Sequence, residues 1–138
     1  MAERYIDAAN AIAGRIGAFA AKRALLGDTI KIMNCEKAIM SGRKEQITER
    51  YYHRRNKVGQ PQKGPFISRL PDRFLRRTIR GMLPYKKTKG AQAYKRIMCY
   101  LGVPEQFKDK KLEKVPGADA EKLQSLKKIT IEEVCKKI

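Results

Sequence analysis

The fold is decided by residues 5–34, which read YIDAANAIAGRIGAFAAKRALLGDTIKIMN. Residues 5–8 form a short apolar run that is typical of a strand. Residues 10–26 then place apolar side chains at helical spacing and end at Gly27, whereas residues 28–34 alternate in the manner of a second strand. A strand, a helix and a strand joined by short connections predict a right-handed βαβ unit with two parallel strands.

A further strand is expected far downstream. Residues 97–101 are a continuous apolar run that Gly102 and Pro104 close, which suits a strand buried in a parallel sheet. The length of 138 residues is that of one domain. We therefore predict an α/β fold of three layers, α/β/α, around a small parallel sheet of about four strands, plus a basic loop-and-helix segment. The expected parts are an α/β core in residues 1–42 and 97–107, the basic segment in residues 43–96, and a charged C-terminal tail in residues 108–138.

The charge is concentrated in the middle of the chain. The whole sequence holds 32 Lys and Arg against 14 Asp and Glu, a net charge of +18, and 42% of its residues are hydrophobic, which is enough for a packed core. Residues 43–96 carry 17 of the basic residues against only Glu45, Glu49 and Asp72, a net charge of +14. A folded domain with such a local excess repels itself unless it meets an anionic partner. Nucleic acid is the partner that this distribution favours.

Several other classes of protein are disfavoured by the sequence. No apolar run approaches the roughly 20 residues of a membrane span, the first ten residues lack the layout of a signal peptide, and no Trp is present to anchor the chain in a membrane surface. The three cysteines, Cys35, Cys99 and Cys135, are widely spaced and accompany a single histidine, so neither a disulfide framework nor a zinc site is expected. We expect a cytoplasmic protein without a cofactor, a membrane partner or a small-molecule substrate.

The clearest element of the basic segment is a helix over residues 71–83. Its spacing places apolar side chains, among them Phe74, Leu75 and Met82, on one side. Arginine binds phosphate through a planar pair of N–H donors and stays charged when partly desolvated. The opposite side of this helix is therefore predicted to bind a nucleic-acid backbone through Arg73, Arg76, Arg77 and Arg80.

A long loop precedes this helix. Residues 57–71 contain three prolines and two glycines, too many for regular structure. Basic side chains are mixed there with aromatic ones that can stack on unpaired bases, namely Phe66 in the loop and Tyr51 and Tyr52 before it. We expect the loop to be mobile in isolation and to become ordered when its partner binds. The neighbouring elements are expected to be a helix over residues 45–55, a basic turn over residues 85–89 and a short helix over residues 90–96.

The predicted RNA-binding residues are the basic side chains of the segment between residues 43 and 89. They are Arg43, Lys44, Arg50, Arg54, Arg55, Lys57, Lys63, Arg69, Arg73, Arg76, Arg77, Arg80, Lys86, Lys87 and Lys89.

The alternatives that are open at this point are a protein that binds DNA or a regulatory RNA, and an enzyme. A DNA-binding or chromatin protein uses the same electrostatics, although the long Gly/Pro loop suits a major-groove reader poorly. An enzyme acting on RNA or a nucleotide would have its site near Asp7 and Asn34, at the ends of the first two strands. The stretch from Gly14 to Gly17 has no phosphate-loop spacing, and His53 has no adjacent carboxylate, so neither indicates catalysis.

An ordered set of motifs resembles a known family over about residues 5–104. The most specific is RGMLP at residues 80–84, with a glycine six positions after Pro84 and a downstream strand that ends in glycine. These motifs resemble the universal L-thirteen family of large-subunit ribosomal proteins. The residues that carry the resemblance are Ile6-Asp7-Ala8, Gly14-Arg15, Ile32-Met33-Asn34, Glu36-Lys37, Ser41-Gly42, Arg77-Thr78-Ile79-Arg80-Gly81-Met82-Leu83-Pro84, Gly90, Ala93 and Tyr100-Leu101-Gly102.

The resemblance implies a three-layer α/β/α domain without catalytic activity. It also implies binding to large-subunit ribosomal RNA, with neighbouring ribosomal proteins as further partners and a role in early subunit assembly. The RNA-facing part of the family would be residues 43–89, the same segment that the charge distribution isolates. The chain is similar to the archaeal-type form, because it ends soon after Ile131.

The C-terminal tail carries one recognisable signal. Thr130 and Glu133 have the spacing of a capping box, which predicts a final helix that reaches Lys137. The rest of residues 108–138 alternates in charge sign, and Pro116-Gly117 interrupts it. The role of this tail stays open.

Overall fold

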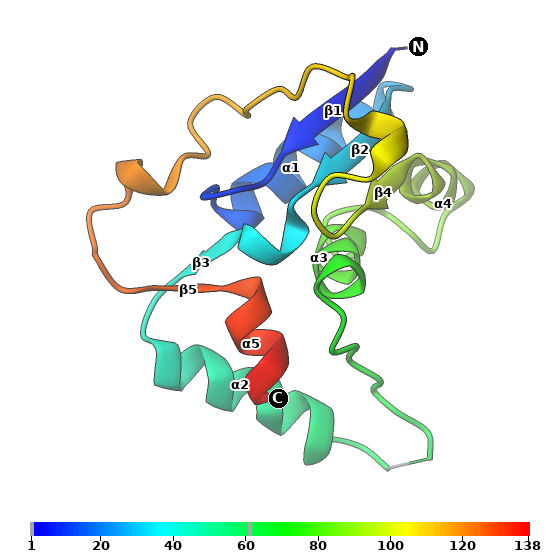
Figure 1. The fold of residues 1–138 in the computed structure, drawn as a ribbon. Coiled ribbons are helices and arrows are strands. Elements are labelled where there is room, and N and C mark those ends of the chain that lie inside the picture. The colour runs from blue at the N-terminus through cyan, green and yellow to red at the C-terminus, as the bar shows by residue number, and fades with distance from the viewer. Residues whose placement is uncertain (1, 61) are drawn as a thin grey trace.

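The central sheet has three parallel strands in the order β1–β2–β4. In the computed structural model, which describes residues 2–60 and 62–138, these strands are β1 (Glu3–Asp7), β2 (Thr29–Met33) and β4 (Ile97–Cys99) (Figure 1). The helix α1 (Ala13–Leu25) connects β1 to β2, which confirms the predicted strand-helix-strand order with parallel strands. Ile6 pairs with Ile32, and Ile32 with Cys99, so the three strands share one register.

One face of the sheet is packed and the other is only partly covered. On the packed face, the strand side chains join one core with α1 and with α3 (Pro71–Arg80). The opposite face carries Tyr5 and Lys31, which are half-buried, under the ring of Phe107, whose centroid lies 5.5 Å from that of Tyr5. In β2, half-buried Thr29 and Lys31 alternate with buried Ile30 and Ile32, as this difference requires. The fully buried residues of the packed face are Ile6, Ile30, Ile32 and Ile97.

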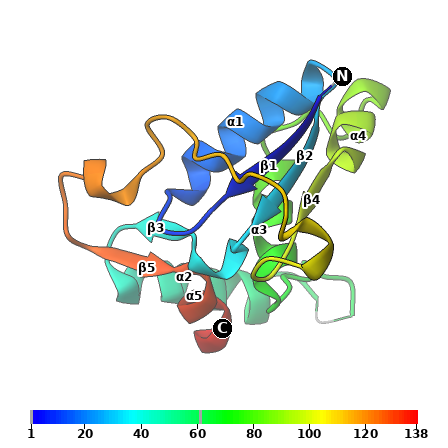
Figure 2. The ribbon, with the colours of Figure 1, turned by 45° about the horizontal axis from the view of Figure 1, so that its top comes forward.

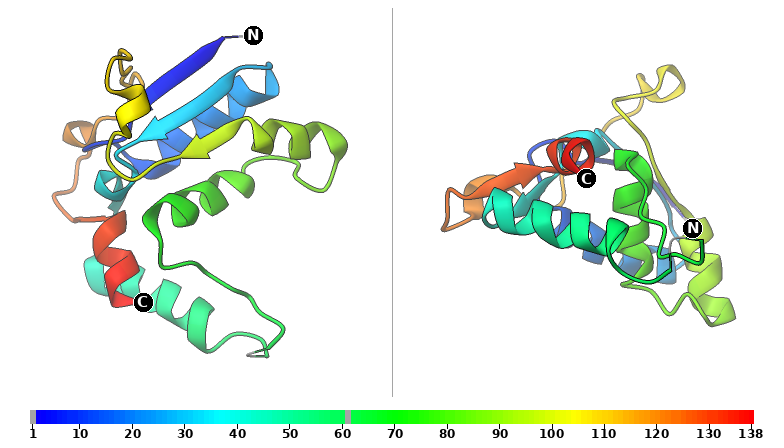
Figure 3. Two further views of the ribbon diagram at one scale, coloured as in Figure 1. Left: turned by 45° about the vertical axis from the view of Figure 1, so that its right-hand side comes forward. Right: turned by 90° about the horizontal axis from the view of Figure 1, so that it is seen from below.

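The α/β class is confirmed, but the sheet is smaller than the expected four strands. The main chain of Glu113 takes the place beyond β1: its N–H donates to the Tyr5 carbonyl at 2.7 Å, and its carbonyl accepts from the Asp7 N–H at 2.9 Å. This isolated parallel bridge is the beginning of a fourth strand that does not continue. The layer on the partly covered face is correspondingly thin, because the described chain there forms only the 3-10 turn η2 (Glu105–Phe107) in place of a longer helix (Figure 3).

The C-terminal residues are an integral part of the fold. β5 (Lys128–Thr130) pairs antiparallel with β3 (Ile39–Ser41), and α5 (Ile131–Lys137) packs against α2 (Lys44–Asn56), α3 and the 3-10 turn η1 (Cys35–Lys37) (Figure 2). A further 3-10 turn, η3 (Ala120–Lys122), lies between the Glu113 bridge and β5. The side chains that these residues add to the core include Ala118, Ile129, Ile131, Val134 and Ile138.

The predicted cap of the last helix is present. The Thr130 hydroxyl accepts a hydrogen bond from the Glu133 main-chain N–H at 3.3 Å, and α5 extends to Lys137 as expected. This bond satisfies one of the main-chain N–H groups that the first turn of a helix leaves without a partner.

The basic segment forms three helices: α2, α3 and α4 (Thr88–Lys95). Figure 3 (left) shows α2 apart from the sheet, with the chain after it running back to α3. Ile47 is the buried residue of α2, and Tyr51 packs edge-on against Phe74 of α3 with ring centroids 4.9 Å apart. The helix α2 is therefore attached to the body mainly through α5 and through this aromatic contact.

The helix α3 ends at Arg80, three residues before the predicted end. The next residues continue in tighter turns, in which the Met82 N–H donates to the Ile79 carbonyl at 2.9 Å. Pro84 explains this change, because a proline disfavours the α conformation in the residue before it. Met82 lies on the predicted side, because its sulfur and the buried Ile79 side chain both lie beside Gly17 of α1, but 40% of Met82 remains exposed.

Candidate nucleic-acid interface

The predicted RNA-binding residues fall into two groups by exposure. Four of them, Arg55, Arg76, Arg77 and Arg80, are half-buried. The half-buried group lies where α2 and α3 face the connecting loop and α4. The exposed group is Arg43, Lys44, Arg50, Arg54, Lys57, Lys63, Arg69, Arg73, Lys86, Lys87 and Lys89.

Arg76 binds the protein's own main chain. Its Nε–H donates to the Ile97 carbonyl at 2.8 Å, and its Nη2 donates to the Tyr94 carbonyl at 3.2 Å. The guanidinium also lies over the Tyr94 ring, 4.0 Å from the centroid, where a cation is attracted to the aromatic face. The expectation that Arg76 shares an exposed surface with Arg73 is thus not met, because its N–H groups join α3 to α4 and β4.

Arg55 and Arg77 hold the loop between the two helices. Arg55, from α2, donates through Nη1 to the Ile67 carbonyl, and Arg77, from α3, donates through Nη1 to the Phe66 carbonyl. Two adjacent carbonyls are therefore bound by arginines that reach them from opposite sides. Ile67, whose side chain is buried, adds an apolar anchor to the same stretch. At this point the main chain of the loop is bound by contacts within the protein.

Two basic residues connect the segment to the C-terminal helix. The Arg69 Nη2 donates to the Ile138 carbonyl at 2.9 Å, and the Lys44 ammonium forms an ion pair with the Glu133 carboxylate at 3.6 Å. The sequence does not indicate either contact, because the residues that meet are separated by half of the chain or more.

Most of the positive charge is left without acidic partners. In the described part of the chain, Lys44 is the one predicted RNA-binding residue that forms an ion pair with a carboxylate. Arg54 and Arg80 instead lie over tyrosine rings, 5.7 Å from the centroid of Tyr51 and 4.8 Å from that of Tyr85. Unpaired cations that face water at this density create a strongly positive surface and attract polyanions.

The basic turn over residues 85–89 places three further cations at the start of α4. Lys86, Lys87 and Lys89 are exposed, and the first turn of α4 holds no acidic residue and no side-chain cap. The N-terminus of a helix already carries partial positive charge, so these lysines oppose the helix dipole unless an anion is present. This end of α4 is therefore suited to an anionic group such as a phosphate.

Gly90 explains why a glycine follows the RGMLP motif six positions after Pro84. A Cβ at residue 90 would lie 2.0 Å from the carbonyl oxygen of Pro84, far inside contact distance. The turn that carries the three lysines can close onto α4 only because this residue has no side chain.

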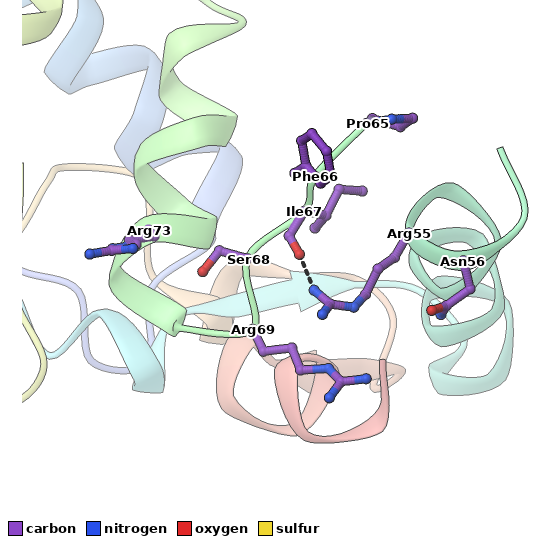
Figure 4. Close-up of a pocket in the computed structure, with 8 residues that line it drawn as sticks. All are labelled: Arg55, Asn56, Pro65, Phe66, Ile67, Ser68, Arg69 and Arg73. Carbon is purple, nitrogen blue, oxygen red and sulfur yellow. Dashed lines mark hydrogen bonds between the residues drawn. The ribbon is translucent and has the colours of Figure 1, made fainter. Parts of the chain in front are cut away.

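A hollow of about 530 Å³ lies beside the loop (Figure 4). Figure 4 shows Arg55 reaching from α2 to the Ile67 carbonyl, while the ring of Phe66 points away from this hydrogen bond. Asn56 and Ser68 also line the hollow and were not predicted, because an uncharged polar residue next to a loop carries no compositional signal. The complete lining is Arg55, Asn56, Pro65, Phe66, Ile67, Ser68, Arg69 and Arg73.

The alternative site at the strand ends is occupied by the protein's own groups. The Asp7 carboxylate accepts hydrogen bonds from the Asn34 amide at 2.9 Å and from the Ala9 N–H at 3.0 Å. These bonds are those of a turn residue and give the Asp7 side chain a structural role.

The cysteines are buried thiols. The neighbouring Cys99 thiol and burial raise the pKa of Cys35, and burial raises the pKa of Cys135 to about 11. Both groups therefore stay protonated near neutral pH, where a thiolate would be needed for nucleophilic attack or metal binding. Within residues 2–60 and 62–138, no cluster of His, Cys, Asp and Glu could hold a metal ion.

Comparison with known proteins gives one family. The family model described as ribosomal protein L13 matches residues 2–106. None of the described helices has the length and apolar character of a membrane span.

Curated relatives match nearly the whole chain. The large ribosomal subunit protein uL13 of Archaeoglobus fulgidus is 41% identical over 94% of this chain and 83% of its own length. That of Methanococcoides burtonii is 41% identical over 96% and 95%, and that of Thermoplasma acidophilum is 40% identical over 98% and 97%.

Proposed function

The chain belongs to the ribosomal protein L13 family, a family of structural ribosomal proteins and not of enzymes, and from this premise we propose that it binds large-subunit ribosomal RNA. The observation that carries the proposal is the net charge of +14 in residues 43–96, most of it on exposed side chains without acidic partners. As a component of the large subunit, the protein acts in the cytoplasm beside other ribosomal proteins and supports early assembly of the subunit.

The division of the basic residues supports a mechanism. The half-buried arginines hold α3, α4 and the loop in fixed positions, and the exposed cations then meet RNA phosphates without having to be ordered first. Contacts with phosphates carry little sequence information, so specificity arises from the shape of the folded RNA. The positions that contribute are those of the exposed group, among which Arg73 on α3 and Lys87 before α4 lie on separate elements.

The affinity for large-subunit ribosomal RNA, measured over a salt series with duplex DNA as competitor, tests this proposal. We expect RNA to be preferred and the logarithm of the affinity to fall with the logarithm of salt concentration at a slope that corresponds to about six or more phosphate contacts. Equal competition by duplex DNA would instead indicate a general nucleic-acid-binding protein outside the ribosome.

A matched pair of double variants locates the contact. Arg73→Glu with Lys87→Glu should weaken RNA binding strongly and flatten the salt dependence. Lys22→Glu with Lys111→Glu changes the net charge equally at exposed positions outside residues 43–89 and should have a small effect. Equal losses in the two double variants would show that only the overall charge matters and would contradict the assignment to residues 43–89.

A further inference from the structure

Phe66 is a large apolar side chain that faces solvent in the middle of the basic segment. It is 67% exposed, whereas its neighbour Ile67 is only 8% exposed. The exposure does not come from a loose chain, because the Phe66 and Ile67 carbonyls are both bound by arginines and the Ile67 side chain is anchored in the core. The protein therefore holds an aromatic ring outward in a fixed position.

The backbone next to this ring leaves no room for another side chain. A Cβ on Gly64 would lie 3.2 Å from two ring carbons of Phe66, and Gly64 has φ +95°, a conformation that favours glycine. On this side, the ring of Phe66 therefore lies close to the main chain of Gly64, which has no side chain. A rigid aromatic group that is already in place loses little entropy when a flat partner stacks on it.

The hollow beside Phe66 has the size and the chemistry for one nucleotide. Its volume of about 530 Å³ lies within the range of small-molecule sites. Arg69 is exposed at its lining; its Nη2 donates to the Ile138 carbonyl, and its other N–H groups are left to bind a phosphate. The Arg73 side chain points away from Phe66 and Arg69 (Figure 4).

The Asn56 amide nitrogen donates to the Tyr52 carbonyl, and the Ser68 hydroxyl oxygen accepts from the Leu70 N–H. The Asn56 amide oxygen and the Ser68 O–H are left for the edge of a base.

We propose that this hollow binds one unpaired nucleotide of the RNA, with its base stacked on Phe66 and its phosphate bound by Arg69. The inference rests on the proposed function and adds to it the kind of RNA feature that is recognised: a base outside a double helix. A base within a duplex is already stacked on both faces and cannot stack on Phe66.

Other exposed aromatic residues of the segment are less suited to this role. Tyr85 is 40% exposed, and the Arg80 guanidinium already lies over its ring, 4.8 Å from the centroid. Tyr52 is 43% exposed and does not line this hollow. Phe66 is therefore the aromatic side chain that combines exposure, a fixed backbone and neighbouring cations.

Fluorescence offers a direct test, because the chain contains no Trp. A Phe66→Trp variant carries a single indole at the proposed stacking position. We expect its emission to be quenched by a single-stranded oligoadenylate and to change little with an RNA duplex of the same length. A Leu126→Trp variant, at a position that is 95% exposed and outside the basic segment, serves as the control and should respond to neither RNA.

The affinity for large-subunit ribosomal RNA provides a second readout. We expect Phe66→Ala to lower it about tenfold, as the loss of one base–aromatic stack does, while Phe66→Trp retains it. The slope of the salt dependence should be unchanged in Phe66→Ala, because no phosphate contact is removed. Both variants should unfold at the wild-type denaturant concentration, since the side chain is exposed.

Two results would overturn the inference: an unchanged RNA affinity of Phe66→Ala, or equal responses of the Phe66→Trp variant to single-stranded and duplex RNA. Failure of the proposed function is distinguishable from both, because the wild-type protein would then show no preference for ribosomal RNA over duplex DNA.

Discussion

The two basic helices, α2 and α3, carry similar charges, but α3 is packed into the core whereas α2 buries little of its surface. α3 buries Phe74, Leu75 and Ile79 and packs against α1 and β4. α2 buries Ile47 and relies on contacts with α5 and on the packing of Tyr51 against Phe74. The arginines of the two helices differ accordingly. Arg76 of α3 donates to main-chain carbonyls, whereas Arg50 and Arg54 of α2 are exposed.

This difference shows that a basic residue in a binding segment is not necessarily a binding residue. A guanidinium near the core finds carbonyl acceptors, because a helix packed against neighbouring elements brings its arginines close to unpaired main-chain oxygens. An arginine that faces solvent, such as Arg50 of α2 or Arg73 of α3, is left to water and to whatever partner arrives, whereas Arg55 of α2 reaches the Ile67 carbonyl of the loop. The net charge of the segment therefore counts both arginines that bind the protein's own main chain and exposed cations that are available to RNA.

The largest effect is expected where α3 joins the core. Leu75→Ala removes a fully buried side chain and should lower the free energy of unfolding by about 2 to 5 kcal/mol. Urea unfolding of this variant measures the loss. Leu126→Ala, at a position that is 95% exposed, is the matched control and should unfold like the wild type. A similar stability of both variants would mean that α3 is not the anchored helix.

A pair of arginine variants separates positioning from binding within α3. Arg76→Ala leaves the carbonyls of Ile97 and Tyr94 without their donor and should lower the free energy of unfolding by about 1 to 3 kcal/mol. Arg73→Ala should leave stability nearly unchanged and should reduce the slope of the salt dependence of RNA binding by about one phosphate contact. Urea unfolding and RNA titrations on both variants test this, and the opposite pattern would reverse the assignment.

A smaller effect is expected where α3 ends. Met82→Ala should lower the free energy of unfolding by about 1 to 2 kcal/mol. The loss is limited because 40% of Met82 is exposed, so that the mutation removes only the apolar contact of the covered part with α1. Urea unfolding of Met82→Ala and of Leu75→Ala compares the two losses of free energy. A loss as large as that of Leu75→Ala would show that Met82 is buried in solution.

The smallest effect concerns the support of α2. Thr130→Ala removes the cap of α5 and should lower the free energy of unfolding by about 1 kcal/mol. Because α5 packs against α2, the variant should increase the rate of amide hydrogen exchange over that of the wild type. This increase should be larger in α2 than in the centre of α3. Equal acceleration in both helices would indicate that α2 and α3 open together and would remove the distinction drawn between them.

Elements with a strong local pattern could be predicted from the sequence. The structure has β1, α1 and β2 within a few residues of the predicted ranges, because apolar spacing and Gly27 act over short distances. The predicted helix over residues 45–55 is α2, and the capping box of Thr130 correctly marks α5. The predicted end of α3 was wrong because the apolar spacing continues to Leu83, whereas the main chain responds to Pro84.

Pairings between distant residues could not be predicted. β3 and β5 have three residues each and are far apart in the sequence, although Ile39 lies opposite Thr130 in the sheet. Short strands have little periodicity of their own, and their pairing depends on packing that brings the two segments together. The same reason applies to the Glu113 bridge that extends the sheet.

The sequence by itself determined the class of the fold, the place of the charge and the family, since composition, periodicity and motifs are properties of neighbouring residues. Only the tertiary structure decided which cations face solvent and which bind carbonyls, because a helix has the same arginine spacing whatever packs against it. It also decided that residues 108–138 belong to the core and that Phe66 is held outward. These outcomes depend on contacts between residues far apart in the chain, which local sequence patterns do not specify.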